Sequence, residues 1–164
     1  MREADLNAVV EALREPIREY VRESRVRIAL LISSSGQVVA QHGFGRSYEL
    51  INIAALAAAA NSAAQALAQM SEAGRWRYMH QAGGAKQLFL APMHVVNGEL
   101  ILVAIFDEQS SVGLAEYFFQ RLSEQLRGLP VFASTRPTSD PIEFERDLEA
   151  GVERVFGKHE QHED

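Results

Sequence analysis

Residues 51–71 read INIAALAAAANSAAQALAQMS, and the rest of the chain is organised around this stretch. It carries no charged residue, and ten of the fifteen positions from 54 to 68 are alanine. Alanine has the highest helix propensity because it loses no side-chain entropy in a helix. The stretch therefore predicts a helix over residues 51–71.

The two faces of this helix differ in side-chain size. The larger apolar residues recur at helical spacing and are predicted to face a core: Ile53, Leu56, Leu67 and Met70, continued by Ala60 and Ala63. The opposite face is small and weakly polar: Ala55, Ala58, Ala59, Asn61, Ser62, Gln65, Ala66 and Gln69. A solvated helix face usually carries Lys and Glu, so this uncharged face predicts a surface that another protein covers.

Two other interpretations of the helix remain open. About 20 apolar residues would cross a bilayer, but the amide side chains in the run disfavour insertion: Asn52, Asn61, Gln65 and Gln69. A helix buried on both sides within one domain is the second alternative. We expect no membrane insertion.

Composition sets the broad class. The chain has 164 residues, of which 47% are hydrophobic and 23% charged, as in an ordinary soluble protein. It has no cysteine, which fits a reducing cytosol, and its charged N-terminus lacks the apolar core of a signal peptide. A net charge of −6 disfavours nucleic acid and anionic membrane as partners. The expected location is cytoplasmic.

Periodicity predicts an α+β domain with the order α-β-β-α-β-β-β-α. An amphipathic helix over residues 2–23 contains Pro16, which is expected to kink it or break it near Arg14. Strands joined mainly by hairpins predict a five-stranded antiparallel sheet with helices on both faces. The expected strands cover residues 25–32, 37–42, 74–81, 86–93 and 99–106, and the last helix of the domain covers 112–126.

The C-terminal part predicts an extension to a domain of residues 1–128. Residues 129–139 are rich in Pro, Ser and Thr and predict a linker, after which Asp140-Pro141 predicts a helix start. From residue 128 on there are nine acidic and four basic residues, a net charge of −5, which leaves −1 for the first 127 residues. We expect the acidic helix to dock on a partner or on its own dimer through one apolar face: Phe144, Leu148, Val152 and Phe156.

No constellation of residues in the sequence predicts catalysis. There is no Gly-rich phosphate loop or dinucleotide fingerprint, and the five histidines show no metal-binding spacing outside the tail. We therefore expect no catalytic, cofactor-binding or metal-binding residue, and no enzyme. Three arginines allow either an arginine finger for another protein's nucleotide or ordinary surface ion pairs: Arg46, Arg75 and Arg77.

Three strings in the same order and spacing resemble the Roadblock/dynein light chain family. ALLISSSGQVVAQHG, from residue 29, is similar to its first hairpin, with Ser33 in place of the usual acidic residue. IAALAAAANSAAQALAQM, from residue 53, is similar to its second helix, which often carries an Asn where Asn61 stands. ELILVAIFDEQSSVGLAEYFFQRLSEQL, from residue 99, is similar to its last strand and third helix. The likeness covers about residues 6–126 and is strongest to MglB-like bacterial members, because of the long first helix, the segment from Trp76 to His80 and the appended helix.

The resemblance implies a homodimer in which two domains join sheets and set their second helices side by side. It implies that this platform receives a small Ras-like GTPase, MglA in polarity and gliding systems, whose own catalytic groups it repositions as a GTPase-activating protein. We expect the dimer to form through residues 51–71 and the short strand near Arg77, Tyr78 and His80, because pairing that strand with its copy covers an open edge.

Three functions are therefore compared. A GTPase-activating protein predicts faster GTP hydrolysis on mixing, and a non-catalytic Roadblock-type scaffold predicts binding without acceleration. A sensor module of the PAS or GAF kind shares a five-stranded antiparallel sheet, but it requires a buried pocket with convergent polar groups, of which the apolar strands offer few.

Overall fold

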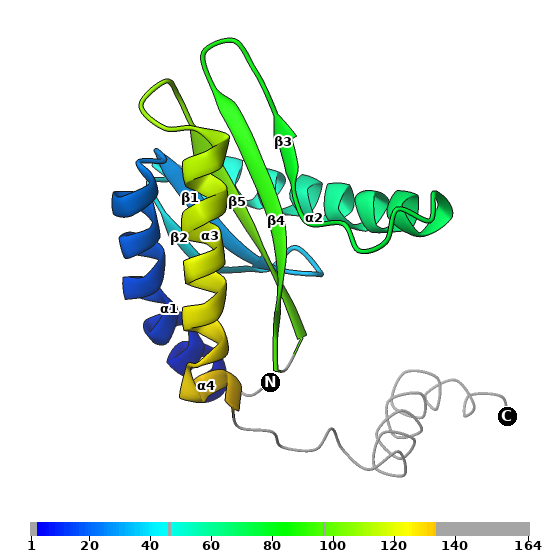
Figure 1. The fold of residues 1–164 in the computed structure, drawn as a ribbon. Helices are drawn as coiled ribbons and strands as arrows, with labels where there is room; N and C mark the ends of the chain where they lie inside the picture. Colours follow the sequence, from blue (N-terminus) through cyan, green and yellow to red (C-terminus); the bar gives the residue numbers. More distant parts are fainter. Residues whose placement is uncertain (1–2, 46, 97, 134–164) are drawn as a thin grey trace, which may run out of the picture. The chain divides into compact units, whose positions relative to one another are not determined.

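Five strands form one antiparallel sheet in the computed structural model, which describes residues 3–45, 47–96 and 98–133 (Figure 1). The strand order in space is β2-β1-β5-β4-β3. Every neighbouring pair is antiparallel, as the predicted hairpins require. The strands are β1 (Ile28–Ser33), β2 (Val38–His42), β3 (Met79–Gln81), β4 (Gln87–Val95) and β5 (Gly98–Phe106).

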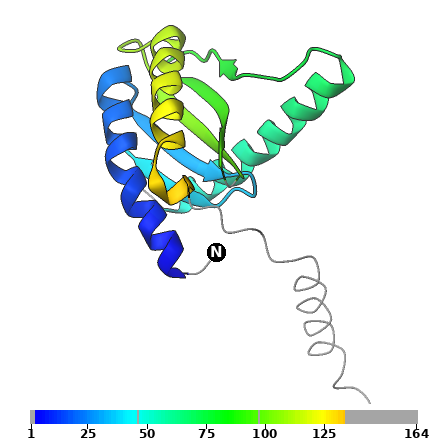
Figure 2. The same cartoon turned by 60° about the horizontal axis from the view of Figure 1, so that its bottom comes forward.

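Helices cover both faces of this sheet. Helices α1 (Glu3–Ser24) and α3 (Val112–Arg127) lie on one face, and α2 (Ser47–Met70) lies on the other (Figures 1 and 2). Residues alternate along β1, so that Leu31 packs in the cluster of α1 and α3 whereas Leu30 and Ile32 pack in the cluster of α2. The predicted α+β class and element order are confirmed.

Helix α1 runs through Pro16 without interruption, so of the two expected effects the break near Arg14 is wrong and the kink stays a prediction. A proline inside a helix removes one backbone hydrogen bond. The side chains on either side of it, Leu13, Ile17 and Tyr20, are buried in the core formed with α3. The Tyr20 hydroxyl also donates a hydrogen bond to the Ala115 carbonyl in α3, at 3.2 Å. Burial of this face outweighs the missing hydrogen bond.

Strand β3 is shorter than predicted, because it covers three residues instead of residues 74–81. The C-terminal half of α2 extends past the edge of the sheet in both views (Figures 1 and 2). Residues 74–78 connect that distant end to the sheet and are not part of it. They begin with Gly74 at a positive φ of 79°.

The first residues of the predicted linker are folded in the structure. Residues Pro130–Ala133 form a short helix, α4, and Phe132 is buried in the core with α1 and α3. An aromatic side chain buries a large apolar area, which explains why the chain folds back here. All described residues belong to one compact unit, Met1–Ser134. The predicted acidic helix with Phe144, Leu148, Val152 and Phe156 lies outside the described residues, so the boundary at 128/129 stays a prediction.

Candidate protein interaction surface

Helix α2 lies on the sheet with a face that matches our prediction only in part, since Ile53 and Ala60 pack there half-buried. Its buried side chains are small: Ala54, Ala57, Ala58, Asn61 and Ala68. Three of the larger apolar residues point away from the sheet, since Leu56 is 71% exposed, Leu67 67% and Met70 84%. The prediction that these residues face the core is therefore wrong.

Small side chains explain this orientation, because they let the helix backbone approach the sheet closely. Gly36 in the β1–β2 turn lies against α2, where an added Cβ would be 3.4 Å from the Ala54 carbonyl oxygen and 3.5 Å from the Ala58 Cβ. Its φ of +82° also favours glycine. A leucine or methionine on the inner face would hold the helix further from the strands.

Between residues 52 and 70, the exposed residues of α2 other than Gln69 form a continuous stripe, which we call the outer face. Its members recur at spacings of three and four, none is charged, and most are apolar: Asn52, Ala55, Leu56, Ala59, Ser62, Ala63, Ala66, Leu67 and Met70. Exposed apolar patches of this kind mark interaction sites on soluble proteins. The outer face is our candidate for the protein-binding surface.

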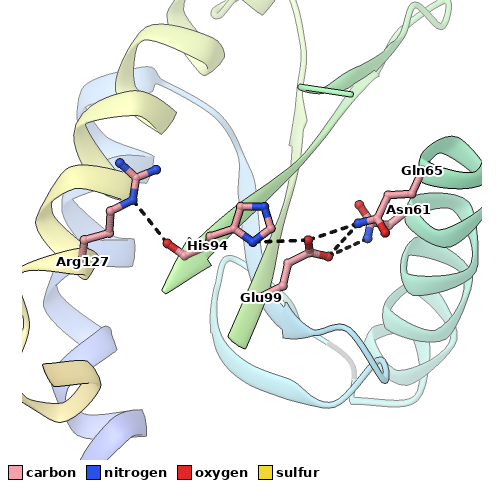
Figure 3. Close-up of polar contacts among 5 residues, drawn as sticks. All are labelled: Asn61, Gln65, His94, Glu99 and Arg127. Carbon is pink, nitrogen blue, oxygen red and sulfur yellow. Dashed lines mark hydrogen bonds and ion pairs between the residues drawn. The ribbon is translucent and has the colours of Figure 1, made fainter. Parts of the chain in front are cut away.

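The inner face carries a polar cluster at the end of β5 (Figure 3). The Glu99 carboxylate accepts a hydrogen bond from Asn61 Nδ2 at 3.0 Å, and Gln65 Nε2 donates to both of its oxygens at 3.0 and 3.1 Å. His94, opposite Glu99 in the β4–β5 register, places Nδ1 3.8 Å from Glu99 Oε2. Asn61 and Gln65 therefore direct their amides toward the sheet.

The remaining predicted site residues lie in and just before the edge strand β3, with His80 in the strand and Arg77 and Tyr78 before it. Within the described part of the chain, β3 is the last strand in the sheet order and pairs with β4 alone. Just before it, Arg77 Nη2 forms an ion pair with Glu116 Oε1 in α3 at 3.2 Å. Tyr78 and His80 contact Phe89 and Phe106, with ring centroids 5.2 and 6.1 Å apart. Both phenylalanines belong to the core below α1 and α3. Arg77, Tyr78 and His80 therefore lie toward the face of the sheet that α1 and α3 cover.

The predicted interaction residues thus fall in three places. Ala55, Ala59, Ser62 and Ala66 lie on the outer face of α2, with Gln69 exposed beside it. Ala58, Asn61 and Gln65 face the sheet. Arg77, Tyr78 and His80 line the free edge of the sheet, toward α3.

Sequence reasoning missed the large apolar residues of the outer face and the role of Glu99. In an alanine-rich helix both faces are apolar, so spacing alone does not say which face is buried. A series of small residues has equally regular spacing and could have indicated the buried face: Ala54, Ala57, Ala58 and Asn61. Glu99 is the one charged residue in an apolar strand, but nothing in the sequence links it to a helix 34 to 38 residues earlier.

Helix α2 also meets a simple length and hydropathy criterion for crossing a membrane, over Glu49–Met70. A single helix of this kind is weak evidence, because core helices meet the same criterion.

These features define a Roadblock-type domain with an exposed apolar helix. The Roadblock/LC7 domain model matches residues 14–106, more than half of the chain, and the protein belongs to this family. No curated protein sequence matches it.

Among solved structures, the chain resembles MglB proteins. Myxococcus xanthus MglB is 20% identical, with a TM-score of 0.66 over 85% of this chain and 98% of that one. The gliding protein MglB from Thermus thermophilus is 26% identical, with a TM-score of 0.63 over 82% and 96%. A structure described as MglB with tetrameric arrangement is also 26% identical, with a TM-score of 0.62 over 81% and 93%. The predicted MglB-like Roadblock resemblance is confirmed.

Proposed function

We propose that this protein is a homodimer that binds a small Ras-like GTPase of the MglA kind and acts as its GTPase-activating protein. The observation that carries the proposal is the outer face of α2, which is exposed, uncharged and apolar over about five helical turns. Family membership and the likeness to a gliding protein support it. We place this function in the cytoplasm, in cell polarity or motility.

The size of the outer face indicates how the dimer would form. Residues 52–70 span about 28 Å of helix with a width of about 10 Å, which is less than the roughly 800 Å² per partner of a stable interface. A second surface must therefore contribute. The free edge of β3 is suited to this, since pairing with its copy would satisfy the backbone groups that the edge leaves exposed.

The chemistry of the outer face indicates how the GTPase would be activated. The part of this face that the second copy leaves free can hold a switch loop by packing, but its side chains carry no positive charge to stabilise a phosphoryl-transfer transition state. Arg77 is already paired with Glu116. We therefore propose that the dimer repositions the GTPase's own catalytic groups.

A GTP turnover assay tests this function. A candidate Ras-like GTPase loaded with GTP is mixed with the full-length protein, and both complex formation and phosphate release are followed. We expect a stable complex and faster hydrolysis. Binding with an unchanged rate would instead establish the non-catalytic scaffold. The proposal is contradicted if the protein binds no Ras-like GTPase from the same cell and accelerates hydrolysis by none of them.

A further inference from the structure

Few side chains hold the C-terminal half of α2 against the sheet. The N-terminal half packs on the sheet through Leu50 and Ile53, which are half-buried, and through single methyl groups such as those of Ala54 and Ala57. A cleft of about 230 Å³ remains under the helix, lined among others by Gln65, Trp76 and Glu99. Beyond this point the helix extends past the sheet (Figures 1 and 2). Among the described residues of α2 beyond Asn61, the only buried apolar residue is Ala68, so apolar packing fixes the C-terminal half of the helix weakly.

The carboxylate of Glu99 lies where the helix leaves the sheet. Its side chain is 16% exposed, and Asn61 is 2% exposed. The two amides on α2 are one turn apart and donate three contacts of 3.0 to 3.1 Å to the one carboxylate. Hydrogen bonds to an ionised acceptor are roughly twice as strong as neutral ones. Rotation or sliding of α2 would break all three contacts at once and leave a half-buried charge poorly solvated.

The strand that pairs with the Glu99 position is contacted by α3 (Figure 3). His94, the register partner of Glu99, accepts at its backbone carbonyl a hydrogen bond of 3.3 Å from Arg127 Nε in α3. This hydrogen bond links the β4–β5 hairpin, which carries Glu99, to α3.

We propose that Glu99 is a positioning residue that sets the orientation of α2, and with it the partner-binding geometry of the outer face. The link to partner binding rests on the function proposed above, whereas the control of α2 itself does not. We call Glu99, Asn61 and Gln65 the Glu99 clamp.

A reciprocal exchange of carboxylate and amide tests the clamp in the full-length protein. Gln65→Glu places two carboxylates together, where like charges repel. The double variant Gln65→Glu/Glu99→Gln restores one carboxylate facing one amide, and the introduced amide oxygen still accepts from Asn61. Gln120→Glu adds the same charge on an exposed position of α3 and is the matched control.

The first measurement is amide hydrogen exchange of α2 in the isolated protein, with β5 as an internal reference. We expect Gln65→Glu to raise exchange over residues 60–70 by at least about tenfold, and the double variant to return it to within about threefold of wild type. The control should leave it unchanged. If Gln65→Glu fails to fold, the double variant decides: a wild-type exchange pattern supports the clamp, and a failure of rescue overturns it. Wild-type exchange in folded Gln65→Glu also overturns it.

The second measurement is the affinity for the GTPase, which should fall by about tenfold in Gln65→Glu and recover in the double variant. Rescue of both exchange and affinity supports the positioning role in full. If Gln65→Glu raises hydrogen exchange and the double variant restores it, but the affinity for the GTPase stays the same in both, then the Glu99 clamp does not control the binding surface. If wild type binds no GTPase, the proposed function fails, and the exchange result still decides whether Glu99 controls α2.

Discussion

Single residues decide which side of α2 meets the sheet. Asn61 is the clearest case, because its amide reaches Glu99 only from the inner face. A buried amide without such an acceptor would cost free energy, so the pair selects one rotation of the helix over the others. The alanines around it permit that rotation by allowing close approach to Gly36.

Tyr20 gives a prediction at this scale. It is buried and donates to the Ala115 carbonyl, so Tyr20→Phe should lower the free energy of unfolding by about 0.5–1.5 kcal/mol near neutral pH. Burial raises the pKa of Tyr20 above its ordinary value of 10.0. The stabilisation by the neutral phenol is therefore complete below pH 10.0 and is lost as the pH rises toward the folded-state value.

Urea unfolding of wild type and Tyr20→Phe at about pH 7 and about pH 11 measures this effect. The stability difference between the two proteins should shrink at the higher pH. A difference that stays constant would show that the ionisation of Tyr20 is not linked to folding.

At the scale of elements, the order of helices and strands could be predicted because each has its own periodicity or turn signal. The Asn97-Gly98 pair, for example, is a strong hairpin signal in the sequence, and β4 and β5 are the two strands that it joins. The orientation of α2 could not be predicted, since it depends on contacts with Gly36 and Glu99, which are distant in sequence. The fold back to α4 was missed for the same reason, because Phe132 is buried by α1 and α3.

Ala59 lies near the middle of the outer face and is exposed. Ala59→Arg should therefore leave the fold intact and abolish self-association, because it adds a charge that a covered apolar surface cannot solvate. Circular dichroism and light scattering measure the two properties. Gln120→Arg on α3 is the control and should remain dimeric. A variant that stays dimeric would show that the interface lies elsewhere.

The whole molecule includes residues beyond the described part of the chain. We predict that deleting residues 135–164 weakens either the dimer or the response of the GTPase, since the predicted helix there has an apolar face that needs a partner. Light scattering and GTP turnover of the shortened protein are the measurements. If both match those of the full chain, the predicted docking of this segment is wrong.

The activation mechanism gives a second prediction at this scale. An arginine finger contributes about 10³- to 10⁵-fold in rate. Because we propose that the protein supplies no such group, Arg46→Ala, Arg75→Ala and Arg77→Ala should each reduce stimulation by less than about tenfold, or roughly 1.4 kcal/mol. Single-turnover hydrolysis at saturating protein measures this. A thousandfold loss in one variant, with the complex intact, would identify that arginine as the finger.

The central claim is that a second copy of the chain covers the outer face of α2. The most direct test is the mass of the wild-type protein in solution, by light scattering or sedimentation at tens of micromolar. We predict a dimer, with twice the 18.2 kDa of one chain, and a single-chain mass for Ala59→Arg. A wild-type protein with the mass of one chain at this concentration would contradict the claim.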